Sequence, residues 1–294
     1  MAAPLATARC FNNGHAMRDA INILFDAYQR FADDDGWAIA SHIALTMLTS
    51  LFPFLIFITA VAGAFGSAEL ADEASKLLLE AWPAHVAGPI SAEIRNVISE
   101  PHRRVLTLGA VLAVYFASSG IEALRIGLNR AYNQKETRSW WLLRLESIGY
   151  VLVGAAALMT LAFCVVLGPL IFEQVAAWFP EFAPLRALFN LARLGAASLA
   201  LMINLVIVHK FLPAGRRSLV MVAPGIAFTF VFCIAAGEAY GLYLARFAGN
   251  YISTYAGLAS VMIALVFLYT MAAIFVFGGE LNAAIARTPH MAKH

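Results

Sequence analysis

Charged residues are scarce in this chain, because Asp, Glu, Lys and Arg make up only 13% of its 294 residues while hydrophobic residues make up 61%. Soluble globular proteins carry roughly 25% charged residues. A mean hydropathy of +0.75 is therefore typical of a membrane protein. The formal net charge is only +2, so the overall charge does not point to a nucleic-acid partner, and we expect none.

Metal-binding and catalytic patterns are also missing. The three cysteines (Cys10, Cys164 and Cys233) have no metal-ligand spacing, and the seven histidines are scattered without an HExxH or HxHxDH motif. A metal-dependent nuclease needs clustered His and acidic ligands. No P-loop is present, so this chain alone cannot use ATP to drive transport. We expect no cofactor, no metal and no enzymatic activity.

Long polar stretches are absent too, whereas apolar stretches fill most of the sequence. Six of them, each of about the ~20 residues that a membrane-crossing helix needs, lie near residues 41–66, 105–128, 147–172, 188–209, 219–246 and 256–286. Their continuous runs exclude the alternating pattern of an outer-membrane barrel. The sequence predicts an all-α polytopic membrane protein with six transmembrane helices.

The sequence predicts three regions. They are a cytoplasmic N-terminal segment (1–36), a six-helix transmembrane domain (37–287) and a cytoplasmic tail (288–294). The first region contains a helical stripe that predicts an amphipathic helix, either on the membrane surface or packed on the bundle; it is formed by Met17, Ala20, Ile21, Leu24, Tyr28 and Phe31. The longest connection, 67–104, predicts two short helices on the outer face.

Basic residues between the apolar stretches predict the orientation. With six spans, the side that holds both termini carries about twice as many Lys and Arg residues as the opposite side. The positive-inside rule therefore places both termini in the cytoplasm. Arg103 and Arg104, in the outer loop, oppose this assignment.

Polar residues inside a span are costly in lipid, so they usually face protein or water. In the second span, Ser118, Glu122, Arg125 and Asn129 recur on one helix face. Glu122 and Arg125 are three residues apart and can pair. Two interpretations stay open: a structural ion pair that locks the bundle, or the polar wall of a substrate cavity.

Other spans contribute further polar candidates. Glu280 lies after two glycines that allow close helix packing, and it can receive Arg125 or become neutral. His42 is either a proton relay or a packing histidine, and Pro53 allows a kink. Glu238 lies within a GxxxG spacing (237–241), with Arg246 as a counter-charge. The candidate substrate-pathway or buried polar residues are His42, Pro53, Ser118, Glu122, Arg125, Asn129, Glu238, Glu280 and Asn282.

Four stretches resemble the YihY/BrkB membrane proteins, formerly labelled ribonuclease BN. The resemblance covers roughly 18–286, with matching span order. It is carried by the runs ALTMLTSLFP (44–53), NRAYN (129–133, preceded by Ser118 and leading to Arg138), LPAG (212–215) and GGELN (278–282). His42 departs from the aromatic or small residue expected near that position. The resemblance implies a six-span protein of the bacterial inner membrane, in a family linked to serum resistance and export of lipidic envelope components.

Two functions remain as alternatives. The first is a transporter or flippase-like protein for a lipidic or amphiphilic envelope substrate, with membrane lipids as partners. The second is a non-catalytic scaffold protein of the envelope, whose polar residues are buried pairs. An enzyme and a channel are weaker alternatives. Helix faces rich in Gly and Ala would also allow a homo-oligomer.

Overall fold

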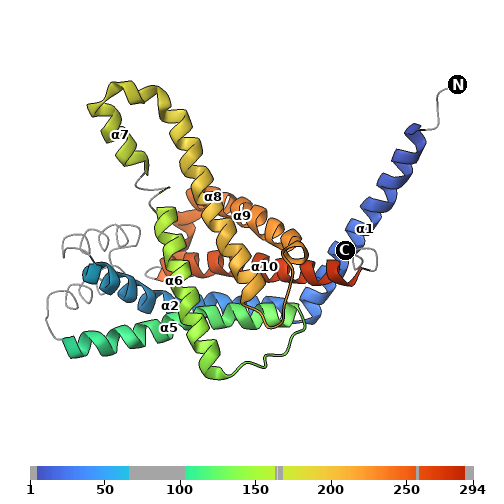
Figure 1. The fold of residues 1–294 in the computed structure, drawn as a ribbon, viewed down its shortest axis with the longest axis horizontal. Helices are drawn as coiled ribbons and strands as arrows, with labels where there is room; N and C mark the ends of the chain where they lie inside the picture. The colour runs from blue at the N-terminus through green and yellow to red at the C-terminus, as the bar shows by residue number, and fades with distance from the viewer. Residues whose placement is uncertain (1–4, 66–102, 163, 165–167, 256–257, 289–294) are drawn as a thin grey trace.

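A computed structural model describes residues 5–65, 103–162, 164, 168–255 and 258–288. In these residues the fold consists of α-helices and one 3-10 helix, which confirms the predicted all-α class (Figure 1). The elements are α1 (Leu5–Asp33), α2 (Gly36–Phe65), α5 (Arg103–Ala131), α6 (Trp140–Ala162), α7 (Gly168–Trp178), η2 (Pro180–Leu185), α8 (Arg186–Phe211), α9 (Leu219–Tyr255) and α10 (Ala259–Arg287).

Helix α10 lies at the centre of the bundle, in contact with α9, α2, α1 and α5, while α2 also packs along α5. Figure 1 shows α2, α5 and α10 running side by side. The core between them is apolar, and its fully buried members include Phe31, Ile43, Leu128, Leu212 and Val276. Five segments distant in sequence therefore share one core.

Among the described residues, four helices are long and apolar enough to cross a membrane. Their apolar segments are Trp140–Leu161, Arg186–Phe211, Leu219–Phe247 and Val261–Arg287. Large apolar side chains on these helices are exposed, as expected for surfaces that face lipid. Helices α2 and α5 cover the first two predicted spans but are not among the four, so the number six stays a prediction. The chain is a multi-pass membrane protein.

The third predicted span, 147–172, contains residues 163 and 165–167, which lie outside the described residues, so its continuity stays a prediction. On either side of them the structure describes α6 up to Ala162 and α7 from Gly168. Pro169 lies in the first turn of α7, where proline is tolerated because the N–H groups of that turn have no partner within the helix. Helix α7 then turns through η2 into α8, and Phe172 stacks on Phe189 with ring centroids 4.7 Å apart.

Helix α1 begins at Leu5 and ends at Asp33, within the acidic run before Gly36. Its Ala27 and Phe31 are buried, whereas Ile21, Leu24 and Tyr28, which belong to the predicted stripe, are exposed. Phe31 also belongs to the predicted stripe, so the contact face coincides with that stripe only in part, and the amphipathic role stays a prediction. Figure 1 shows the N-terminal part of α1 extending away from the bundle. The two helices expected in the outer loop lie outside the described residues.

Helices α9 and α10 approach each other closely at a pair of glycines. A Cβ atom added at Gly225 would overlap the carbonyl oxygen of Gly278, and one added at Gly278 would overlap Thr229 Oγ1. By contrast, a Cβ at Gly237 or Gly241 would meet no atom within 4 Å. The GxxxG spacing at 237–241 therefore does not mark a close helix contact among the described residues.

Candidate functional site

Two loops meet at one end of the bundle. The α5–α6 loop (132–139) and the α8–α9 loop (212–218) are joined by Asn129, at the end of α5. Its Oδ1 accepts a hydrogen bond of 2.6 Å from Ala214 N, and its Nδ2 donates one of 3.2 Å to Glu136 Oε2. Because Asn129 is buried, these bonds fix both loops on the same helix end.

Arg138 makes the second connection between the loops. Its guanidinium pairs with Glu136 at 2.8 Å and Glu146 at 2.7 Å, and donates a hydrogen bond of 3.1 Å to Leu212 O. The hydrogen bonds from Arg138 lower the pKa of the Glu136 carboxyl from its ordinary value of 4.5 to about 2. A planar guanidinium is suited to holding two carboxylates and a carbonyl at once.

Asn282 on α10 makes the third connection. Its Oδ1 accepts a 2.6 Å hydrogen bond from Gly225 N, and its Nδ2 donates a 3.0 Å hydrogen bond to the Tyr132 hydroxyl. The guanidinium of Arg217 lies 3.9 Å from the centroid of the Tyr132 ring. Burial raises the pKa of the Tyr132 hydroxyl above its ordinary value. Asn282 thus positions, through Tyr132, a cation of the α8–α9 loop.

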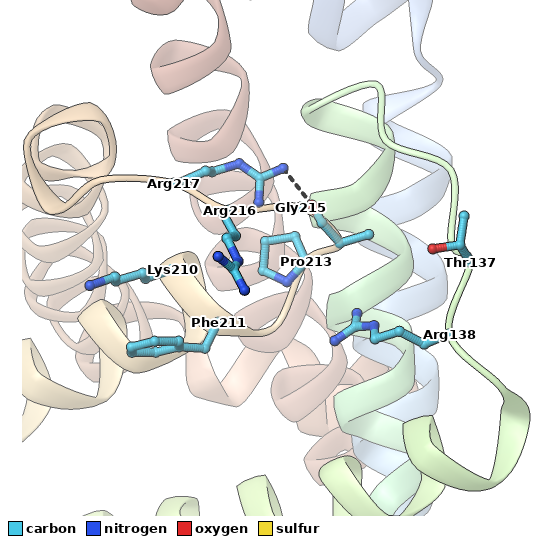
Figure 2. A pocket seen from close by; sticks show the side chains of 9 residues that line it. Thr137, Arg138, Lys210, Phe211, Pro213, Gly215, Arg216 and Arg217 are labelled. Atoms are coloured by element: carbon cyan, nitrogen blue, oxygen red, sulfur yellow. Dashed lines mark hydrogen bonds between the residues drawn. The ribbon is translucent and has the colours of Figure 1, made fainter.

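A cavity of about 490 Å³ lies beside these loops. Figure 2 shows Arg216 and Pro213 between Lys210 and Phe211 on one side and Arg138 on the other. The lining residues combine four cations with an aromatic ring and a proline; they are Thr137, Arg138, Lys210, Phe211, Pro213, Ala214, Gly215, Arg216 and Arg217. Its volume lies within the range of roughly 300–1,000 Å³ that is common for ligand sites.

A second cavity of about 230 Å³ shares Gly215, Arg216 and Arg217 with the first and adds Arg287 from α10. No Asp or Glu is among the described residues that line either cavity. The Nη1 atom of Arg217 is buried without a hydrogen-bond partner, and burial lowers the pKa of Arg217 below its ordinary value. The two cavities therefore form a basic region, which can hold a group of opposite charge.

The predicted pair between Glu122 and Arg125 is not formed. Glu122 Oε2 instead lies 2.7 Å from Arg144 Nη1, in an ion pair with α6. Arg125 donates hydrogen bonds to the carbonyl of Leu143, at 3.0 Å, and to Ser147 Oγ. The reason is geometric: α6 packs against this face of α5 and offers closer partners than the next turn of α5 does. Both residues connect α5 to α6.

Glu280 is not paired with Arg125 either. Its side chain is only 1% exposed, and its Oε2 has no hydrogen-bond partner. Ser118 is buried, and its hydroxyl donates within its own helix to Tyr115 O at 2.7 Å. His42 is exposed. The predicted cluster of His42, Glu122, Arg125 and Glu280 is thus not held by mutual ion pairs among the described residues, and none of the four lines the two cavities.

Two candidates lie elsewhere in the fold. Pro53 lies inside α2 and is half-buried. Glu238 is exposed on α9, as is Arg246, and no ion pair joins them in the part of the chain that the structure describes. Within the same described part, no group of three or more His, Cys, Asp or Glu side chains lies close enough to hold a metal ion.

The cavity residues themselves were not among the predicted site residues. Arg138, Lys210, Arg216 and Arg217 entered the sequence argument only as loop charges that set orientation or as neighbours of a motif. A signal was nevertheless present, because three cations flank the turn Leu212-Pro213-Ala214-Gly215. Of the predicted residues, Asn129 and Asn282 position this region through the contacts described above.

The comparisons with known proteins agree with this architecture. The family described as virulence factor BrkB matches residues 27–294. The ribonuclease-like protein YfkH of Bacillus subtilis (strain 168) is 25% identical over 269 residues, which cover 90% of this chain and 95% of YfkH. The UPF0761 membrane protein RC1_0578 of Rhodospirillum centenum (strain ATCC 51521 / SW) is 27% identical over 275 residues, or 91% of this chain and 58% of that protein. No solved structure matches. The chain belongs to the BrkB family.

Proposed function

We propose that this protein moves a lipidic or amphiphilic envelope substrate through the bacterial inner membrane, with both termini in the cytoplasm. The observation that carries the proposal is the cavity beside the two loops. It places cations next to an exposed aromatic ring, Phe211, at the ends of membrane-spanning helices. Such a combination suits a molecule with a charged part and an apolar part.

The position of the cavity supports this function. It lies where α8 ends and α9 begins, next to the α5–α6 loop. Trp140 and Trp141, at the start of α6, are exposed at the same end, and tryptophan is enriched at the membrane–water interface. A substrate bound there would have its polar part at the interface and its apolar part toward the lipid.

The energy source of such movement lies outside this chain. The sequence has no P-loop, so movement is either downhill or coupled to an ion gradient or a partner protein. A downhill lipid-movement assay is therefore the direct test. Purified protein would be reconstituted into vesicles that carry a fluorescent, headgroup-labelled anionic lipid, and a membrane-impermeant quencher would be added outside.

In protein-free vesicles, the quencher removes about half of the signal, because only the outer leaflet is accessible. We expect substantially more quenching with the protein, and we expect Lys135→Ala, which changes an exposed loop cation outside both cavities, to behave like the wild type. Quenching equal to that of protein-free vesicles, for both anionic and amphiphilic labelled probes, would refute the proposal.

A scaffold function is the second candidate, and a specific observation favours it. The polar residues of α5 connect helices, since Glu122 pairs with Arg144 and Arg125 bonds to Ser147. Under this function the protein would move no lipid, and its removal would dissociate an envelope complex. The vesicle assay separates the two functions, because only the first predicts added quenching.

We propose a non-enzymatic role for the chain. The ribonuclease-like description belongs to YfkH, and the histidines of the present sequence show no nuclease spacing. Incubating purified protein with labelled RNA and Mg²⁺ or Zn²⁺ tests this, and metal-dependent cleavage that co-purifies with the protein would contradict it.

A further inference from the structure

Five cations line the two cavities, which share Gly215, Arg216 and Arg217, and the partners of these cations differ. Arg138 is held by Glu136 and Glu146, so its charge is already compensated. Lys210, Arg216 and Arg217 have no carboxylate within ion-pair distance among the described residues, and Lys210 Nζ lies 4.9 Å from the centroid of the Phe211 ring. The Nη1 atom of Arg217, buried without an acceptor, adds an unsatisfied donor. The positive charge of Lys210, Arg216 and Arg217 thus lacks a carboxylate counterpart among the described residues.

A buried guanidinium donor without an acceptor is unfavourable, because the loss of its hydration is not offset by a hydrogen bond within the protein. A bound anion with several acceptor oxygens would remove this cost. Arginine and lysine donors, close together and without competing carboxylates, are the usual partners of phosphate. Arg138 adds little free positive charge to the site, because Glu136 and Glu146 already compensate its guanidinium.

We propose that the basic cavity formed by Lys210, Arg216 and Arg217 binds the phosphate group of an amphiphile, whose apolar part lies against Phe211. This inference rests on the proposed function, because it assigns a ligand class to the same cavity. Lys210 and Arg216 supply charge from the wall, and Arg217 is held in place by its hydrogen bond of 2.9 Å to Ala214 O and by the Tyr132 ring.

The test uses the full-length protein in nanodiscs of zwitterionic lipid, with binding measured by calorimetry. Three soluble probes are compared: dihexanoyl phosphatidic acid, inorganic phosphate, and dihexanoylglycerol, which lacks the phosphate. The variant is Lys210→Ala/Arg216→Ala, since neither residue makes a described bond that holds the fold. The matched control is Lys135→Ala, which removes an exposed loop cation outside both cavities.

We expect the phosphatidic acid probe to bind the wild type and Lys135→Ala equally, and to bind the double variant about tenfold more weakly or worse. Higher salt should weaken binding to the wild type. Inorganic phosphate that competes with similar affinity would identify the phosphate alone as the ligand, whereas weak competition would identify the lipid headgroup with its chains. Either outcome supports a phosphate site.

Equal affinity for dihexanoylglycerol and dihexanoyl phosphatidic acid would overturn the inference, as would unchanged affinity in the double variant. If the double variant fails to elute like the wild type, the charge-retaining Lys210→Arg/Arg216→Lys and the single Arg216→Ala replace it, with binding expected to be retained in the first and weakened in the second. Phosphate binding without lipid movement would refute the proposed function alone. Lipid movement that persists without phosphate binding would refute this inference alone.

Discussion

The close approach of α9 and α10 gives the sharpest prediction for stability, because the same helix provides its own control. Gly225→Ala would place a Cβ atom against the backbone oxygen of Gly278 and 2.5 Å from Asn282 Nδ2. Gly237→Ala, in the same helix, would place its Cβ in open space. The two variants change the same atom and the same intrinsic helix propensity, and they differ only in the surroundings.

The magnitudes follow from the contacts. Overpacking typically costs about 1–3 kcal/mol, and a backbone oxygen cannot rotate away as a flexible side chain can. Displacing Asn282 would also weaken its bond to Gly225 N, a net loss of about 1 kcal/mol. Alanine returns up to about 1 kcal/mol through lower entropy of the unfolded chain. We therefore expect Gly225→Ala to lower the free energy of unfolding by about 1–3 kcal/mol and Gly237→Ala to leave it unchanged or slightly raised.

The assay is the midpoint of thermal unfolding in one detergent, followed by fluorescence and by the monodisperse fraction in size-exclusion chromatography. Gly225→Ala should unfold several degrees below the wild type, while Gly237→Ala should unfold at or above it. Equal midpoints for the two variants, or a lower midpoint for Gly237→Ala, would refute the assignment of the close contact to Gly225 and Gly278.

Three further predictions concern the connections between helices and loops. Glu122→Gln should lower the free energy of unfolding by about 1–3 kcal/mol, because it leaves the buried Arg144 without its ion pair; a double-mutant cycle with Arg144→Gln should show clear non-additivity, and additive effects would contradict the pair. Tyr132→Phe should cost about 1 kcal/mol, since it loses the bond from Asn282 but keeps the ring beneath Arg217, whereas Tyr132→Ala should cost more in the same unfolding assay. Because the pKa of Glu136 in the folded protein, about 2, lies below its ordinary value of 4.5, the stability from its pairing is present above pH 4.5 and is lost as the pH falls toward 2. The gap in stability between wild type and Glu136→Gln should therefore close over this window, and a gap independent of pH would contradict the pairing.

How far the sequence predicts this fold depends on what each pattern measures. Continuous apolar stretches report burial in lipid or protein, so the all-α class and the four apolar spans follow from them directly. They do not report the bounds of individual helices, and so they did not indicate that Pro169 lies in the first turn of α7. The apolar stripe on α1 likewise indicates a helix, but it does not indicate which of its residues another helix covers. Phe31 is buried, whereas Leu24 is exposed.

In the candidate site, too, the sequence predicts which residues share a helix face but not which residues they contact. Spacing along α5 places Ser118, Glu122, Arg125 and Asn129 on one face, but it cannot tell that α6 covers that face. Glu122 and Arg125 therefore found partners on α6 that local spacing did not predict. The choice of partner is a tertiary property, because an ion pair forms with the nearest group of opposite charge and not with the nearest in sequence.

The glycines show why spacing alone is a weak indicator of packing. Two glycines four residues apart allow a close approach but do not cause one, and Gly237 and Gly241 face no neighbour. At Gly225 the approach has a cause that the local sequence does not contain. Asn282 Oδ1 accepts a hydrogen bond from the Gly225 N–H, and Asn282 Nδ2 donates one to the Tyr132 hydroxyl.

Asn129 and Asn282 connect the predicted polar residues to the basic cavity. An asparagine amide carries a donor and an acceptor on one rigid plane, so one buried side chain can satisfy two backbone or side-chain groups from different elements. Asn129 uses both to fix the α5–α6 and α8–α9 loops, and Asn282 uses both to join α9 to Tyr132. A charged residue in either place would leave part of its charge uncompensated in a buried setting. Asn129 and Asn282 thus act by positioning, because their hydrogen bonds hold the α8–α9 loop, which carries Arg216 and Arg217, and the Tyr132 ring next to Arg217.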